Sequence, residues 1–111
     1  MVEKRKFERF SVELSAAYAN EPDGERVTCS IVELSQEGLR LNMYEKIQFG
    51  QALPLEVLLP GSDEPLRIVM TVRWSKQLYD NSGFDYLAGG ELAAPDADTI
   101  QKLIAYAQET A

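Results

Sequence analysis

Residues 10–18 read FSVELSAAY, from Phe10 to Tyr18, and this stretch decides the fold class. Apolar side chains at every second position from Phe10 onward alternate with Ser11, Glu13, Ser15 and the small Ala17. Because successive side chains of a strand point to opposite faces, this alternation predicts a β-strand with one buried face. The sequence NEPDG at residues 20–24 follows, and its Pro, Asp and Gly predict the turn that ends the strand.

Five further runs with a period of two follow along the chain. The fourth ends at Pro60-Gly61, and the sixth lies between Asn81-Ser82-Gly83 and Gly89-Gly90, which we expect to close it. Within the fifth, Trp74 falls on the same face as Val72, which favours a core position over a ring stacked on a ligand. The five predicted strands cover residues 27–31, 39–43, 53–59, 66–74 and 84–86.

The period changes near the C-terminus, where residues 95–109 are predicted to form a helix. Asp96 or Asp98 can cap its first turn. Six short strands followed by one helix predict an antiparallel β-barrel or sandwich with the helix packed on it. The apolar face of the helix has side chains at i, i+3, i+4 and i+7, namely Ile100, Leu103, Ile104 and Ala107.

The composition predicts a single soluble domain over residues 1–111, with a flexible basic arm at 1–9, a barrel at 10–90 and the helix at 95–109. Apolar residues make up 45% and charged residues 26% of the 111 residues, as in globular proteins. No apolar run approaches the roughly 18 residues of a membrane span, and the N-terminus lacks the apolar core of a signal peptide. With Cys29 as the only cysteine, we expect a cytoplasmic protein without membrane insertion.

The missing residue types argue against an enzyme. The sequence contains no histidine, which removes the commonest general base and every Ser-His or Cys-His catalytic pair. One cysteine without histidine also argues against a structural zinc site. We therefore expect no catalytic activity, no bound metal and no cofactor.

Charge is distributed unevenly along the chain. The net charge is −7, but residues 1–9 carry four basic and two acidic side chains, a net charge of +2, which leaves −9 for the rest. An acidic body disfavours nucleic acid, which needs a broad basic face. A short basic segment can still bind a small anion, because arginine–phosphate contacts are local. The alternative is a solvated basic terminus with no ligand.

Two short motifs are candidates for a binding site. Arg5 and Arg9 form an R-x-x-x-R spacing before the first predicted strand, and two such guanidiniums can converge on one anion. Glu33, Ser35 and Gly38 lie between the second and third strands. A carboxylate there can accept the N1 and N2 hydrogens of guanine, and Gly38 permits a positive φ. Taken singly, the first spacing occurs by chance and the second also fits a plain Ser/Gly turn.

Together, the two motifs resemble those of the PilZ family, bacterial receptors for cyclic di-GMP. The family pattern is R-x-x-x-R near the N-terminus, then (D/N)-x-S-x-x-G about two strands later. Residues 72–74 and 83–86 are similar to later strands of the family, so that the resemblance covers residues 4–105. It implies a six-stranded antiparallel β-barrel with a C-terminal α-helix.

The resemblance also implies roles for individual residues. Arg5 and Arg9 would clamp the phosphates and stack on guanine, while Ser35 and the carboxylate of Glu33 would bind a guanine edge. Gly38 would shape the turn, and Lys4 would contact the ligand or influence how many nucleotides bind. The expected partners are cyclic di-GMP and an unidentified downstream protein, with no nucleic acid.

One residue departs from the family pattern. Glu33 stands where the family has Asp or Asn, and its extra methylene displaces the carboxylate. A lost hydrogen bond to a charged group corresponds to about ten- to hundredfold in affinity. This departure supports an alternative, a PilZ-like protein-interaction adaptor that binds no nucleotide. A small-barrel nucleic-acid binder and an enzyme are the remaining alternatives.

Overall fold

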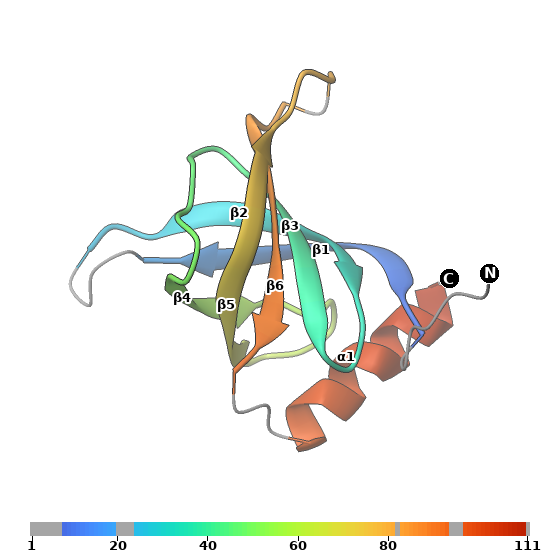
Figure 1. Ribbon diagram of the computed structural model, residues 1–111. Coiled ribbons are helices and arrows are strands. Elements are labelled where there is room, and N and C mark those ends of the chain that lie inside the picture. The colour runs from blue at the N-terminus through green and yellow to red at the C-terminus, as the bar shows by residue number, and fades with distance from the viewer. Residues whose placement is uncertain (1–7, 20–23, 82, 94–96, 111) are drawn as a thin grey trace.

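The computed structural model describes residues 8–19, 24–81, 83–93 and 97–110 and shows a closed β-barrel with one helix (Figure 1). All strand pairs are antiparallel, and the order around the barrel is β1-β2-β3-β6-β5-β4. The elements are β1 (Phe10–Tyr18), β2 (Val27–Leu34), β3 (Gly38–Met43), β4 (Ala52–Val57), β5 (Leu66–Gln77), β6 (Tyr86–Leu92) and α1 (Ala97–Thr110). This arrangement confirms the predicted fold and selects the barrel over the sandwich.

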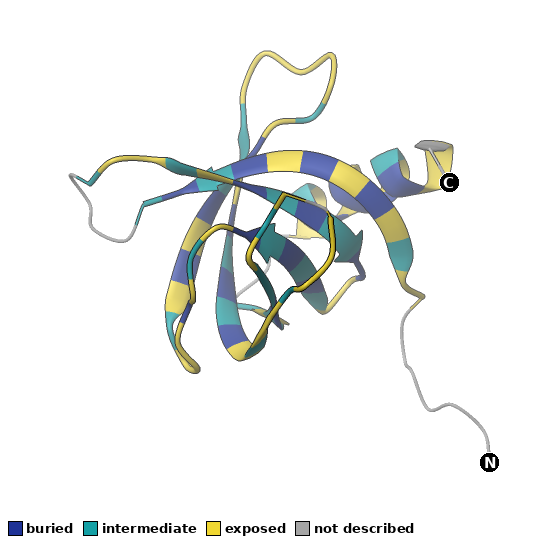
Figure 2. Cartoon of the chain, turned by 90° about the horizontal axis from the view of Figure 1, so that it is seen from above, coloured by how far each residue is buried: buried dark blue, intermediate teal, exposed yellow. Residues whose placement is uncertain are grey.

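Alternation of side chains builds the core, as predicted from residues 10–18. Along β1, buried and exposed positions follow each other with a period of two (Figure 2). The inward side chains of all six strands meet inside the barrel. The largest that are fully buried are Leu14, Tyr18, Ile31, Leu34, Leu41, Met43, Leu53, Leu55, Val57, Met70 and Val72.

Helix α1 packs against β1 and β5 through the apolar face that its sequence predicted (Figure 1). Its four predicted contact residues, Ile100, Leu103, Ile104 and Ala107, are all buried. Asp98 lies in the first turn, where a carboxylate favours the positive end of the helix dipole. The other candidate cap, Asp96, lies outside the described residues. Helix α1 is neither long enough nor apolar enough to span a bilayer.

Several strand boundaries differ from the prediction, and β2, for example, continues three residues past Ile31 to Leu34. β4 ends at Val57, two residues early, and β5 continues past Trp74 to Gln77. The expectation that Gly89-Gly90 closes the sixth strand was wrong, because β6 begins at Tyr86 and runs through both glycines to Leu92.

Close packing explains why glycines occupy the middle of β6. A Cβ on Gly89 would overlap the indole of Trp74, and a Cβ on Gly90 would overlap the carbonyl oxygen of Thr71. Neither Gly89 nor Gly90 has a positive φ. The two glycines therefore mark a close approach of β5 to β6 and not a turn.

Candidate functional site

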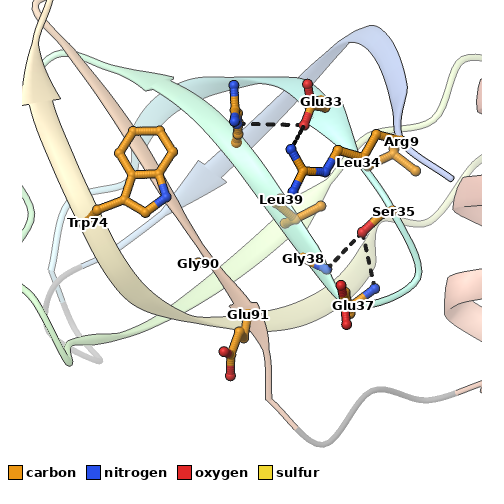
Figure 3. A pocket seen from close by; sticks show the side chains of 11 residues that line it. Arg9, Glu33, Leu34, Ser35, Glu37, Gly38, Leu39, Trp74, Gly90 and Glu91 are labelled. Atoms are coloured by element: carbon orange, nitrogen blue, oxygen red, sulfur yellow. Dashed lines mark hydrogen bonds and ion pairs between the residues drawn. The ribbon is translucent and has the colours of Figure 1, made fainter. Parts of the chain in front are cut away.

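A pocket of about 220 Å³ lies beside the turn between β2 and β3 (Figure 3). Side chains reach it from the residue before β1, from β2 and β3, and from β5 and β6. Its lining residues are Arg9, Glu33, Leu34, Ser35, Glu37, Gly38, Leu39, Arg40, Trp74, Gly90 and Glu91. The structure thus brings together four of the five predicted site residues, Arg9, Glu33, Ser35 and Gly38. The fifth, Arg5, lies outside the described residues, as does Lys4.

Ser35 organises the turn between β2 and β3. Its Oγ accepts hydrogen bonds from the backbone N–H groups of Glu37 and Gly38, each at 3.3 Å. Its own N–H donates to the carbonyl of Gly38 at 3.0 Å. The side chain is only 8% exposed, yet neither of these Oγ bonds uses the hydroxyl hydrogen. Ser35 therefore fixes the turn through its oxygen, and its hydroxyl hydrogen takes part in neither bond.

Gly38 is needed for space and not for a left-handed conformation. The sequence permits a positive φ at Gly38, but Gly38 is not among the glycines with that geometry. It is instead the first residue of β3 and pairs with Glu91 of β6. A Cβ at this position would overlap the carbonyl oxygen of Gly90. The close approach holds the turn against β6, where the N–H of Leu92 also donates to the carbonyl of Glu37 at 2.9 Å.

The carboxylate of Glu33 lies between two guanidinium groups (Figure 3). Its Oε1 is 3.8 Å from Nη1 of Arg9 and 3.6 Å from Nε of Arg40. A register shift between Ile31 and Glu33 breaks the alternation of β2, and Leu34 is buried while Glu33 is only partly buried. This irregularity directs Glu33 outward, toward Arg40, its cross-strand partner on β3.

Trp74 lines the pocket from β5, which corrects its predicted place in the core. The side chain is 37% exposed. A register shift between Val72 and Trp74 means that two residues of β5 are matched by one step of β6, from Gly90 to Gly89. The extra residue reverses the direction of the following side chains, so that Val72 points inward and Trp74 outward.

Arg40 is a pocket residue that sequence reasoning missed. Its guanidinium carbon lies 5.5 Å from the centre of the Trp74 ring, within the range of a cation–π interaction. The signal was present in the sequence, because Arg40 lies between Leu39 and Leu41 on the outward face of a predicted strand. A short turn between Glu33 and that strand predicts that Glu33 and Arg40 lie opposite each other on neighbouring strands.

The described lining of the pocket is slightly acidic. Two guanidiniums, Arg9 and Arg40, face three carboxylates, Glu33, Glu37 and Glu91. Glu91 is 3.3 Å from Nη2 of Arg73, a salt bridge at the pocket edge. The further basic residues near the start of the chain lie outside the described part. Any tightly bound anion would therefore need positive charge in addition to Arg9 and Arg40.

Cys29 is not placed to act as a nucleophile. It lies on the inner face of β2 and is buried. Burial raises the pKa of its thiol to about 12, so that the thiol stays protonated at neutral pH.

Fold and pocket together define a small closed β-barrel that carries a surface pocket at its β2–β3 turn. The model of the PilZ domain family matches residues 3–109, and the chain belongs to this family. Comparison with curated proteins yields no match.

Solved structures of PilZ proteins share the fold. The PilZ domain of YcgR from Escherichia coli, solved with c-di-GMP, has a TM-score of 0.72 at 12% identity, covering 96% of this chain and 91% of that one. The Bacillus subtilis inhibitor of motility, MotI/DgrA, has a TM-score of 0.74 at 19% identity and 98% coverage of this chain. The K. pneumonia MrkH–c-di-GMP complex has a TM-score of 0.73 at 17% identity and 100% coverage. This chain spans 52% of the length of MotI/DgrA and 57% of that of MrkH.

Proposed function

We propose that this protein binds cyclic di-GMP in the pocket at the β2–β3 turn and acts as a receptor or adaptor, not as an enzyme. The observation that carries the proposal is the meeting of Arg9, Glu33, Ser35 and Gly38 around one pocket. Family membership and the c-di-GMP named for YcgR and MrkH support it.

Each residue has a proposed contact with the ligand. Arg9 binds a phosphate, and Arg5 adds the further guanidinium that the acidic lining requires. The carboxylate of Glu33 accepts hydrogen bonds from the N–H groups of a guanine edge, and the hydroxyl of Ser35 donates its hydrogen to an acceptor atom of the same base. Gly38 keeps the turn close to β6 and so holds the Ser35 hydroxyl at the pocket.

We propose that ligand binding signals by changing the surface of the protein that a partner contacts. Arg5 and Arg9 share the ligand with the β2–β3 turn, so that bound nucleotide joins the start of the chain to the barrel. A ligand that binds this joined state better than the open one shifts the population toward it. An unidentified cytoplasmic protein would then recognise the joined surface.

Titration calorimetry with cyclic di-GMP tests this function. We expect saturable binding to the wild-type protein and its loss in Arg9→Ala and Arg5→Ala, with the barrel still folded by circular dichroism. Arg67→Ala is the matched control, because Arg67 pairs with Glu56 at 3.6 Å and does not line the pocket. Wild-type binding that survives both arginine substitutions would contradict the proposed site.

The alternative is a protein-interaction adaptor that binds no nucleotide. It is favoured by one observation, the three carboxylates that face two guanidiniums in the described lining. Thermal unfolding separates the two functions, because a ligand at about 100 times its Kd stabilises the fold by about 2.7 kcal/mol. An unchanged Tm at millimolar cyclic di-GMP would favour the adaptor.

A further inference from the structure

One carboxylate oxygen already occupies the point where two guanidiniums converge. Oε1 of Glu33 is the acceptor in both ion pairs, at 3.8 Å from Arg9 and 3.6 Å from Arg40 (Figure 3). Arg9 directly precedes β1, whereas Glu33 and Arg40 are cross-strand partners on β2 and β3, and Arg40 is also held over the ring of Trp74. The two arginines therefore form an anion site that is filled by the protein itself.

A phosphate oxygen and a carboxylate oxygen are equivalent acceptors for a pair of guanidiniums. We propose that Oε1 of Glu33 marks the position of a phosphate oxygen of the nucleotide, and that binding displaces Glu33 from Arg9 and Arg40. This inference rests on the proposed function and adds two points to it. Arg40 becomes a phosphate-binding residue, and Glu33 becomes an internal competitor that lowers the affinity of the site.

The length of the side chain matters for this competition. Glu33 stands where the family pattern has Asp or Asn, and its extra methylene carries the carboxylate out to both arginines. A shorter carboxylate on the same backbone would fall short by about one carbon–carbon bond, and both ion pairs would lengthen. Once displaced, the Glu33 side chain is free to accept hydrogen bonds from a guanine edge.

Glu33→Gln separates competition from guanine binding. The amide keeps an acceptor oxygen for guanine but loses both ion pairs. Each half-exposed pair corresponds to up to about fivefold in affinity, so that we expect cyclic di-GMP to bind about three- to tenfold more tightly. Unchanged or weaker binding of Glu33→Gln in calorimetry would overturn the inference while leaving the proposed function intact.

The control variant removes the same charge from the same pocket. Glu37 lines the pocket, but in the described part of the chain it forms no ion pair with Arg9 or Arg40. We expect Glu37→Gln to raise the affinity less than twofold. An equal gain in the two variants would assign the effect to net charge and would overturn the inference.

A double-mutant cycle tests the role of Arg40. Arg40→Ala should weaken nucleotide binding, and in that background the gain from Glu33→Gln should shrink, because one of the two ion pairs is already gone. An undiminished gain would show that Glu33 does not compete at Arg40. Glu33→Asp, which keeps the charge and shortens the chain, is a second variant and should also bind more tightly than wild type.

Inorganic pyrophosphate distinguishes the inference from the proposed function. Suppose that no variant binds cyclic di-GMP but Glu33→Gln binds pyrophosphate more tightly than Glu37→Gln does. The competition would then stand and the nucleotide function would fall. Equal pyrophosphate affinities of the two variants, without nucleotide binding, would overturn both.

Discussion

Ser35 is buried although its side chain is short and polar, and its burial has a structural reason. A buried hydroxyl is tolerated only when it forms hydrogen bonds, and Oγ accepts from two backbone N–H groups of the turn. The same residue is proposed to donate to the ligand. The Ser35 side chain therefore stabilises the turn and is also proposed to bind the ligand.

Ser35→Ala should lower the free energy of unfolding by about 1–2 kcal/mol, because the N–H groups of Glu37 and Gly38 lose their acceptor. Urea unfolding followed by circular dichroism measures this loss. Ser62→Ala is the control, because Ser62 Oγ forms an exposed hydrogen bond to the carbonyl of Glu64. Equal stabilities of the two variants would show that Ser35 does not hold the turn.

Gly89→Ala should change the pocket more than the fold. The added Cβ would overlap the indole of Trp74, a side chain that can move away. Gly90→Ala should instead cost about 1–3 kcal/mol, because its Cβ would meet the backbone carbonyl of Thr71. Urea unfolding ranks the stabilities, and a greater loss in Gly89→Ala than in Gly90→Ala would contradict this account.

The sequence predicted the position of a single residue correctly where a short local motif determines that position. Ser35 and Gly38 were placed at the pocket because they share one short turn. Trp74 was wrongly placed in the core, because a period-two pattern carries no sign of the register shift that turns it outward. Arg5 stays a prediction.

At the scale of elements, α1 is held to the barrel by its apolar face. Leu103→Ala should destabilise the protein by about 2–4 kcal/mol, because Leu103 is fully buried where the helix meets the strands. The exposed Gln101 of the same helix provides the control Gln101→Ala, expected to change stability by less than 0.5 kcal/mol. Thermal unfolding by calorimetry compares the two, and a similar Tm would show that the helix contributes little.

The type of each element was predictable, whereas several boundaries were not. Strand β5 runs three residues beyond Trp74 because it pairs with β6 as far as Gln77 and Tyr86. Strand β6 crosses its two glycines because neighbours on β5 demand their small size. Both boundaries depend on a partner strand, and the local sequence around them contains no information about that partner.

At the scale of the whole molecule, the closure of the sheet fixes the pocket. Strands β3 and β6 are neighbours although two strands lie between them in the sequence, and this pairing brings Glu91 beside Gly38. Strands β1 and β4 close the circle with the pairs from Ala16–Val57 to Tyr18–Leu55. Such long-range pairing decides between barrel and sandwich, which the periodicity of single strands left open.

The stability of the whole molecule should fall steeply in alkaline solution. Burial raises the pKa of the Cys29 thiol from 9.0 to about 12. Burial, and then the hydrogen bond to Glu45 at 2.5 Å, raise the pKa of Tyr18 above its ordinary 10.0. Both groups ionise at lower pH in the unfolded chain than in the folded chain, so that the unfolded chain binds fewer protons. The free energy of unfolding therefore falls as the pH rises.

Between pH 9 and 12, Cys29 alone should remove about 1.4 kcal/mol of stability per pH unit. Urea unfolding at a series of pH values measures the slope. In Cys29→Ala the slope should be shallower by that amount, although the variant is less stable overall. Parallel slopes for the two proteins would contradict the assignment to Cys29.

The outward turn of Trp74 has a practical consequence. The sequence contains one tryptophan, and the structure places its indole in the pocket wall beneath the guanidinium of Arg40. Indole emission responds to a charge moving across the ring or to solvent leaving it. Intrinsic tryptophan fluorescence of the unlabelled protein should therefore report on ligand binding in this pocket.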